Sequence, residues 1–251
     1  MQLTPTMFLI VCPMLFLAGF VDAIGGGGGL ISLPAYIFAG LPIHYSIATN
    51  KLSSTCGTSL ATVRFIRHGM VNYRLALPSV LCAVAGSSLG ARMSLFMSEQ
   101  IMKNVLLIVL PAAAFFVLNK KLFKDRGSEA KADRRIYIVA SLAAFIVGMY
   151  DGFYGPGTGT FLIIAFTVFA GMGLSAANGQ TKVINLTTNI TSLIIFSING
   201  QVVIPLGIAG ALCNMAGNYI GAGFAMEKGS RIVRPVILLV LFLLLIKILT
   251  S

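Results

Sequence analysis

The sequence predicts an all-α polytopic membrane protein made of two inverted-topology repeats, each with about five helical segments. Three observations lead to this fold class: an apolar composition, an internal repeat, and glycine clusters that interrupt the apolar runs. Of the 251 residues, 57% are hydrophobic and 10% charged, whereas a soluble domain carries about a quarter charged residues. So short a chain cannot bury that much apolar surface in water, which excludes a soluble enzyme. The net charge of +11 comes without a basic face or nucleic-acid-binding motif, so we expect no nucleic-acid partner.

An internal repeat divides the chain in two. Residues 17–34 (LAGFVDAIGGGGGLISLP) share a pattern of Gly, Asp and clustered glycines with residues 146–163 (IVGMYDGFYGPGTGTFLI). Residues 51–91 also align with the second half without a gap, at an offset that places Lys51 on Lys182. This stretch holds 11 identities in 41 positions, where composition alone gives about three. The predicted units are a first transmembrane repeat (1–119), a basic linker (120–135) and a second, inverted repeat (136–251).

Five apolar segments make up the first half. The first follows an uncharged start and lacks the basic region of a signal peptide, so we expect a mature span. The second reaches only about 20 Å as a helix, against a hydrocarbon core of about 30 Å, and is a short broken or re-entrant helix. The third is long but unusually polar, and the last two are apolar runs of spanning length. The predicted segments are 6–24, 29–41, 43–67, 74–97 and 100–119.

The second half repeats this order of segments. A span leads into a break rich in glycine and proline, which a short apolar segment follows. A long polar segment and two further apolar runs complete the half. The predicted segments are 135–153, 158–172, 174–199, 203–226 and 232–250.

The placement of basic residues predicts the orientation of the chain. Lys and Arg collect in cytoplasmic loops, and the linker 120–135 carries seven basic residues against three acidic ones. If the short segments complete a crossing, the halves are inverted, both termini lie outside, and the basic loop around Arg231 is cytoplasmic. If they only re-enter, that loop becomes external, which its three basic residues disfavour. A lipid head-group or partner contact is the alternative to a plain solvated linker.

Glycine clusters follow the first span of each half. Such backbone would leave polar groups unpaired in lipid, so it must face protein or a watery cavity. In transporters with inverted repeats, broken helices meet at a substrate site near the bilayer midplane, and the free N–H groups at a helix start favour an anion. Close helix packing through small residues is the alternative. The candidate residues are Gly25, Gly26, Gly27, Gly28 and Gly29 in the first half, and Gly155, Gly157, Thr158 and Gly159 in the second.

One lysine lies in the polar third segment of each half. Lys51 and Lys182 are equivalent in the repeat, and polar residues three and seven positions later share a helix face with each. A lysine at a helix centre costs about 2.5–3.5 kcal/mol on insertion scales, so we predict that both cations line an anion pathway. The alternative is that each extends to a head-group layer. The neighbouring candidates for substrate binding are Asn50, Thr58, Thr181 and Asn185.

Two aspartates lie within the apolar spans, again at equivalent positions. Asp22 and Asp151 each come three or four residues before a glycine cluster. They are candidates for coupling, either by pairing with the lysines in the empty carrier or by relaying protons. Capping or bracing of the broken-helix backbone is the alternative.

These motifs resemble the TauE/SafE-type sulfite exporter family, also described as toluene-sulfonate uptake permeases. The resemblance rests on Gly25–Gly29 followed by Leu30, on the GTSL sequence 57–60, and on the GPGTGTF sequence 155–161. It covers almost the whole chain as duplicated halves. It implies transport of sulfite, sulfoacetate, other organosulfonates or related small sulfur anions across a prokaryotic inner membrane.

The sequence therefore predicts a secondary transporter of a small sulfur-containing anion that works by alternating access. A gradient must drive it, because the glycine run lacks the Lys-Ser/Thr of an ATP-binding loop. A passive anion channel is one alternative, and a membrane enzyme or sulfur-relay protein using Cys82 and Cys213 is another. We expect no enzyme activity, cofactor or metal. The expected partners are the anion, the lipid bilayer and a coupling proton or sodium ion, with a homo-oligomer left open.

Overall fold

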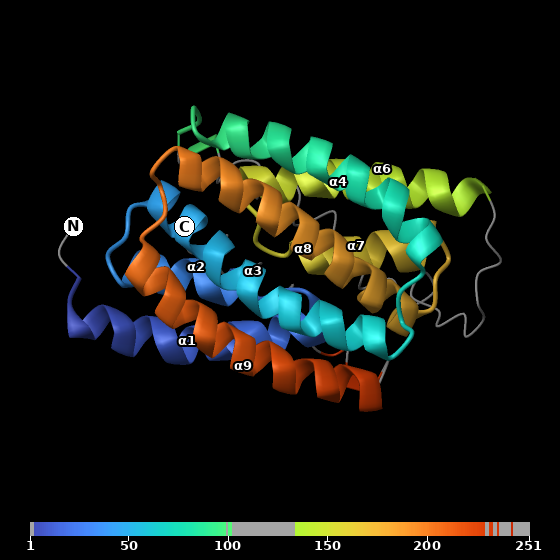
Figure 1. Ribbon diagram of the computed structural model, residues 1–251, viewed down its shortest axis with the longest axis horizontal. Coiled ribbons are helices and arrows are strands. Elements are labelled where there is room, and N and C mark those ends of the chain that lie inside the picture. The colour runs from blue at the N-terminus through green and yellow to red at the C-terminus, as the bar shows by residue number, and fades with distance from the viewer. Residues whose placement is uncertain are drawn as a thin grey trace.

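The computed structural model describes residues 3–98, 100–101, 134–228, 231, 232, 235 and 242, and every regular element among them is helical. Figure 1 shows the arrangement of these helices. The first half contributes α1 (Pro5–Gly25), α2 (Gly29–Phe38), α3 (Ile43–Arg67) and α4 (Tyr73–Ser94). The second half contributes α6 (Arg134–Phe153), α7 (Thr158–Ile164), the π-helix η1 (Ala165–Phe169), α8 (Leu174–Ile198) and α9 (Ile204–Lys228).

These helices confirm the predicted positions of the first four segments in each half. The two short segments end earlier than predicted, at Phe38 and Phe169. The reason is that Gly40 and Gly171 follow with positive φ angles of 93° and 69°, a backbone conformation that leaves the helix. The predicted fifth segments, 100–119 and 232–250, lie outside the described residues except for a few single positions.

The linker prediction is tested only at its C-terminal end. Arg134 and Arg135, which we assigned to the linker 120–135, form the exposed first turn of α6. The remainder of the linker lies outside the described residues, and its cytoplasmic placement stays a prediction.

The helices differ in their capacity to cross a membrane. Four of them, α1, α4, α6 and α8, are both long and apolar enough to do so. The helices α3 and α9 each have 25 residues but are not among these four. With 10 residues, α2 extends about 15 Å, half of a hydrocarbon core of about 30 Å. The number of crossings and the inverted orientation of the halves stay predictions.

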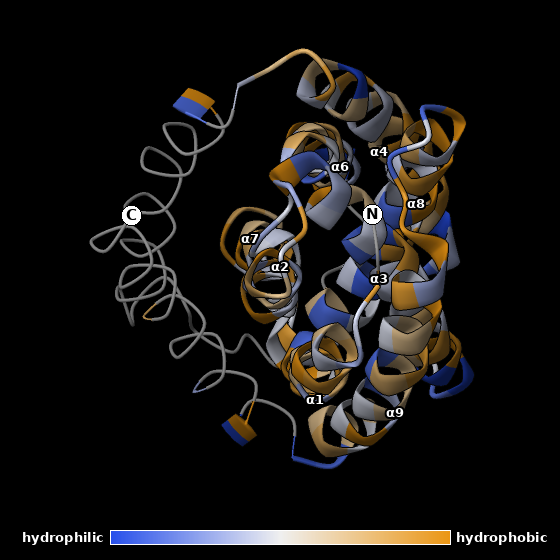
Figure 2. Cartoon of the chain, turned by 90° about the vertical axis from the view of Figure 1, so that its left-hand side faces the viewer, coloured by the Kyte–Doolittle hydropathy of each residue, from blue (hydrophilic) through white to orange (hydrophobic). Residues whose placement is uncertain are grey.

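The fourth helix of each half packs on the other half. In Figures 1 and 2, α9 lies along α1 and α4 lies along α6, and these are the two most extensive helix contacts. One group therefore consists of α1, α2, α3 and α9, and the other of α4, α6, α7 and α8, with α3 and α8 in contact between them. Figure 1 also shows α3 and α8 running in opposite directions across the molecule, as do α4 and α9.

Paired glycines bring these exchanged helices close together. On α4, Gly86 and Gly90 face α6, and a Cβ at Gly86 would overlap the Phe145 carbonyl. On α9, the equivalent Gly217 and Gly221 face α1 in the same way. Spacing of four residues between small side chains lets helix backbones approach, which is how helices associate in a lipid environment. The repeat thus produces the same glycine contact twice.

Candidate functional site

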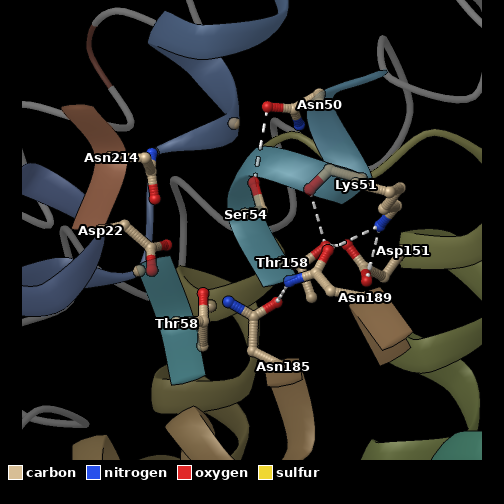
Figure 3. A pocket seen from close by; sticks show the side chains of 15 residues that line it. Asp22, Asn50, Lys51, Ser54, Thr58, Asp151, Thr158, Asn185, Asn189 and Asn214 are labelled. Carbon is tan, nitrogen blue, oxygen red and sulfur yellow. Dashed lines mark hydrogen bonds and ion pairs between the residues drawn. The ribbon is translucent and has the colours of Figure 1, made fainter. Parts of the chain in front are cut away.

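A small polar cavity lies between the two helix groups. Its lining comes from α1, α2, α3, α6, α7, α8 and α9 and from the glycine bends after α1 and α6. The volume open to the centre of a water molecule is about 20 Å³, which is room for one or two waters. Figure 3 shows the polar side chains converging on this space, and Figure 2 shows hydrophilic positions gathered in the interior around α3.

The two glycine bends touch each other beside the cavity. Gly26 ends α1 with a φ of 77°, and Gly155 and Gly157 precede α7 with φ of 98° and 83°. A Cβ at Gly159 would lie 2.5 Å from the Cα of Gly26, so only glycine fits at this crossing. The two glycine bends therefore meet, as predicted for broken helices beside a site. The alternative explanation of the glycines, close packing of the backbone, also applies here, because the same contact requires it.

Lys51 forms a buried ion pair with the aspartate of the other half. Its Nζ lies 2.8 Å from Oδ2 of Asp151, and both side chains are 3% exposed. The same ammonium donates to Oδ1 of Asn189 at 3.2 Å. The other carboxylate oxygen of Asp151 accepts from the Thr158 hydroxyl at 2.8 Å. An ammonium held by three elements is therefore fixed at the edge of the cavity.

Lys182 forms the equivalent pair with Asp22. Its Nζ lies 3.0 Å from Oδ2 of Asp22 and also donates to the main-chain oxygen of that residue. The lysine side chain is fully buried. Both lysines therefore pair inside the protein, and the alternative that they extend to head-groups is wrong. Pairing with the lysines, one of the roles considered for Asp22 and Asp151, is the arrangement in this structure.

Neutral hydrogen-bonding groups complete the cavity wall. Asn189 donates to Oδ1 of Asn185 at 3.2 Å, which leaves the Asn185 amide group on the side of Thr58 (Figure 3). On α3, the Ser54 hydroxyl donates to Oδ1 of Asn50 at 3.4 Å. Hydroxyls from the first half thus face amides from the second half across the space.

Most of the predicted site residues line this cavity. Those that do are Asp22, Gly26, Gly28, Gly29, Asn50, Lys51, Thr58, Asp151, Gly155, Thr158, Gly159 and Asn185. Those that do not are Gly25, Gly27, Gly157, Thr181 and Lys182.

Three lining residues, Ser54, Asn189 and Asn214, were not among the predicted site residues. Ser54 and Asn189 lie on the faces predicted for the lysines, so the helical spacing could have included them. Asn214 is an amide within the apolar run 203–226, and that isolated polar position was the signal to follow. It reaches the cavity because Gly57 on α3 leaves room for its side chain.

The cysteines proposed for a sulfur relay lie elsewhere. Cys82 and Cys213 are half-buried rather than buried, and neither lines the cavity. Cys82 instead borders an apolar groove on the outer surface between α4 and α6. Among the described residues, no three His, Cys, Asp or Glu side chains form a group that could hold a metal ion.

A helical membrane protein with a buried, charge-lined cavity between two helix groups is of the transporter class. A family model described as "Sulfite exporter TauE/SafE" matches residues 11–248. The chain belongs to the TauE/SafE sulfite exporter family. No solved structure matches it.

Several curated relatives cover nearly the whole chain. A Sinorhizobium protein named probable membrane transporter protein ORF9 is 33% identical over 94% of this chain and 90% of its own length. The Escherichia coli probable membrane transporter protein YfcA is 32% identical over 95% and 88%. A Haemophilus influenzae probable membrane transporter protein is 33% identical over 92% and 90%. The chain is therefore a multi-pass membrane transporter by family.

Proposed function

We propose that the protein is a secondary transporter that moves a small sulfur-containing oxyanion, sulfite or an organosulfonate, by alternating access between its halves. The observation that carries this proposal is Lys51, an ammonium on the wall of a polar cavity that is also lined by amides, hydroxyls and the carboxylates of Asp22 and Asp151. Amides, hydroxyls and an ammonium are the groups that hold oxyanions, since each donates a hydrogen bond to oxygen.

Charge balance supports coupling of the anion to a proton. Lys51, Lys182, Asp22 and Asp151 lie together and their formal charges cancel. An anion that enters would leave one uncompensated negative charge in the interior, which is strongly unfavourable. A proton taken up by Asp151, once the anion has displaced it from Lys51, would restore neutrality. A proton gradient is therefore the proposed driving force.

The size of the cavity supports alternating access rather than a permanent pore. A space of about 20 Å³ is too small for a sulfonate. The Lys51–Asp151 pair must open before an anion fits. We assign this arrangement to an occluded state of the carrier.

The test is counterflow of radiolabelled sulfite into proteoliposomes preloaded with unlabelled sulfite. A carrier gives saturable accumulation that Lys51→Ala abolishes, while the matched surface variant Arg92→Ala retains it. Unsaturated flux without counterflow would instead indicate a channel. Loss of flux in a variant without cysteines, with Lys51 intact, would indicate the sulfur-relay alternative. Absence of counterflow with sulfite, sulfoacetate and taurine alike would refute the proposal.

A further inference from the structure

The two ion pairs occupy equivalent repeat positions but have different surroundings. Lys51 lines the cavity and shares its ammonium between Asp151 and Asn189. Lys182 does not line the cavity, whereas Asp22, which pairs with its ammonium, does. An anion in the cavity can therefore reach the first ammonium directly, and the second only if Asp22 moves away.

Side chains of α8 cap the C-terminal end of α1. The Lys182 ammonium donates to the main-chain oxygen of Asp22. One turn earlier on α8, Nδ2 of Asn178 donates to the carbonyls of Ala23 and Ile24 at 3.3 and 3.1 Å. The last carbonyls of a helix have no partner within it, and a cation there also offsets the negative end of the helix dipole. Lys182 is therefore part of a cap as well as an ion pair.

The α7 helix extends this cap into the glycine bend. The Thr160 hydroxyl donates to the Gly25 carbonyl at 2.6 Å, and the Thr160 N–H donates to the Gly26 carbonyl at 3.2 Å. Five successive carbonyls, from Asp22 to Gly26, thus accept hydrogen bonds from the second half of the chain. The broken end of α1 is bound to the opposite half along its whole length.

The broken end of α6 is satisfied mainly by its own segment. The Thr158 hydroxyl bonds Asp151 and the Gly155 carbonyl, at 2.8 and 2.7 Å. The Tyr150 hydroxyl donates to the Pro156 carbonyl at 2.7 Å. These three hydrogen bonds stay within residues 150–158, and Asp151 joins this end to α3 through its pair with Lys51.

The sequence explains why the two ends differ. At the repeat position of Asn178, α3 carries Ile47, and at the position of Thr160, α2 carries Ile31. Neither isoleucine side chain has a donor, so the first half cannot cap α6 as the second half caps α1. The asymmetry follows from two substitutions between otherwise equivalent halves.

We propose that the two lysines have different roles. Lys51 contacts the anion, and its pair with Asp151 opens when the anion enters. Lys182 is a positioning residue that keeps the end of α1 fixed on α8 throughout transport. This inference rests on the proposed function for the role of Lys51, whereas the role of Lys182 concerns the structure alone.

Hydrogen–deuterium exchange on the wild-type protein without ligand tests the positioning role. Backbone amides over 22–30 should exchange at least about tenfold more slowly than those over 151–159, because five successive carbonyls at the end of α1 accept hydrogen bonds from the other half of the chain. Equal exchange, or faster exchange over 22–30, would overturn the inference. This measurement requires no substrate, so it stands even if the transported anion is misassigned.

Sulfite binding by paired neutral variants tests the division of roles. Asp22→Asn with Lys182→Gln should bind sulfite within about threefold of wild type, and Asp151→Asn with Lys51→Gln at least about tenfold more weakly. Equal loss in both double variants would show that both lysines contact the anion and would overturn the inference while the proposed function stands. Unchanged binding in both would refute the role of Lys51 in the proposed function.

Discussion

Lys51 on α3 and Asp151 on α6 lie 2.8 Å apart, Nζ to Oδ2, and join the two halves of the chain in its interior. The equivalent Lys182 on α8 joins Asp22 on α1 in the same crossed manner. Each half therefore supplies the cation for the carboxylate of the other. A conformational change that separates the halves must break or carry along both pairs, which links anion binding to domain movement.

Removing one charge of a pair should destabilise the protein more than removing both. Lys51→Met leaves Asp151 charged and buried, which costs about 3–5 kcal/mol, whereas Lys51→Met with Asp151→Leu should recover most of this loss. Thermal unfolding followed by circular dichroism measures the difference, since the chain has no tryptophan. A double variant as unstable as the single one would show that the ion pair itself is required.

Neutralising Asp151 should strengthen anion binding and weaken transport. Asp151→Asn removes the carboxylate that competes for Lys51, so sulfite should bind about tenfold more tightly. The same change removes the proposed proton acceptor, so proton-driven uptake should fall to the level of exchange. Binding is measured by calorimetry and proton movement by a pH-sensitive dye inside the liposomes. Unchanged gradient-driven flux in Asp22→Asn plus Asp151→Asn would exclude proton coupling through these carboxylates.

The crossing of the glycine bends should tolerate no side chain. Gly26→Ala places a Cβ against the backbone of Gly159 and also forces alanine into a φ of 77°. Gly40→Ala is the matched control, because its φ is 93° but nothing lies within 4 Å of the added carbon. The control should lose only the stability that this backbone strain costs, about 1–2 kcal/mol. By contrast, Gly26→Ala should abolish folding or transport. Similar stability of the two variants would mean that the bends do not touch.

The residue at position 189 should affect how tightly Lys51 binds an anion. Oδ1 of Asn189 accepts from the Lys51 ammonium at 3.2 Å. Asn189→Asp places a second carboxylate on this ammonium, so sulfite affinity should fall at least about tenfold. Asn185→Asp is the comparison, because Asn185 is hydrogen-bonded to Asn189 rather than to the lysine. The sulfite affinity of Asn189→Asp should fall although the Lys51–Asp151 pair is intact. An unchanged affinity would show that Lys51 is not part of the binding site.

Local chemistry was sufficient to place most of the helices and to identify the charged residues. The polar segment 43–67 became α3 over the same residues, because Pro42 before it and Gly69 after it set its limits within the chain itself. The repeat offset likewise identified Lys51 with Lys182, and the cost of burying a charge indicated that both required partners. Family membership followed from the same glycine motifs.

Which side chains and helices contact each other was decided by packing between distant segments, which the periodicity of the sequence does not predict. That Lys51 faces Asp151 rather than Asp22, and that α4 and α9 pack on the opposite half, depends on how glycine notches let helices approach. Asn214 reaches the cavity only through the space left by Gly57, more than 150 residues earlier in the chain. That only one of two equivalent buried lysines lines the cavity has the same origin, because the surroundings of a side chain depend on its neighbours in space and not on its position along the chain.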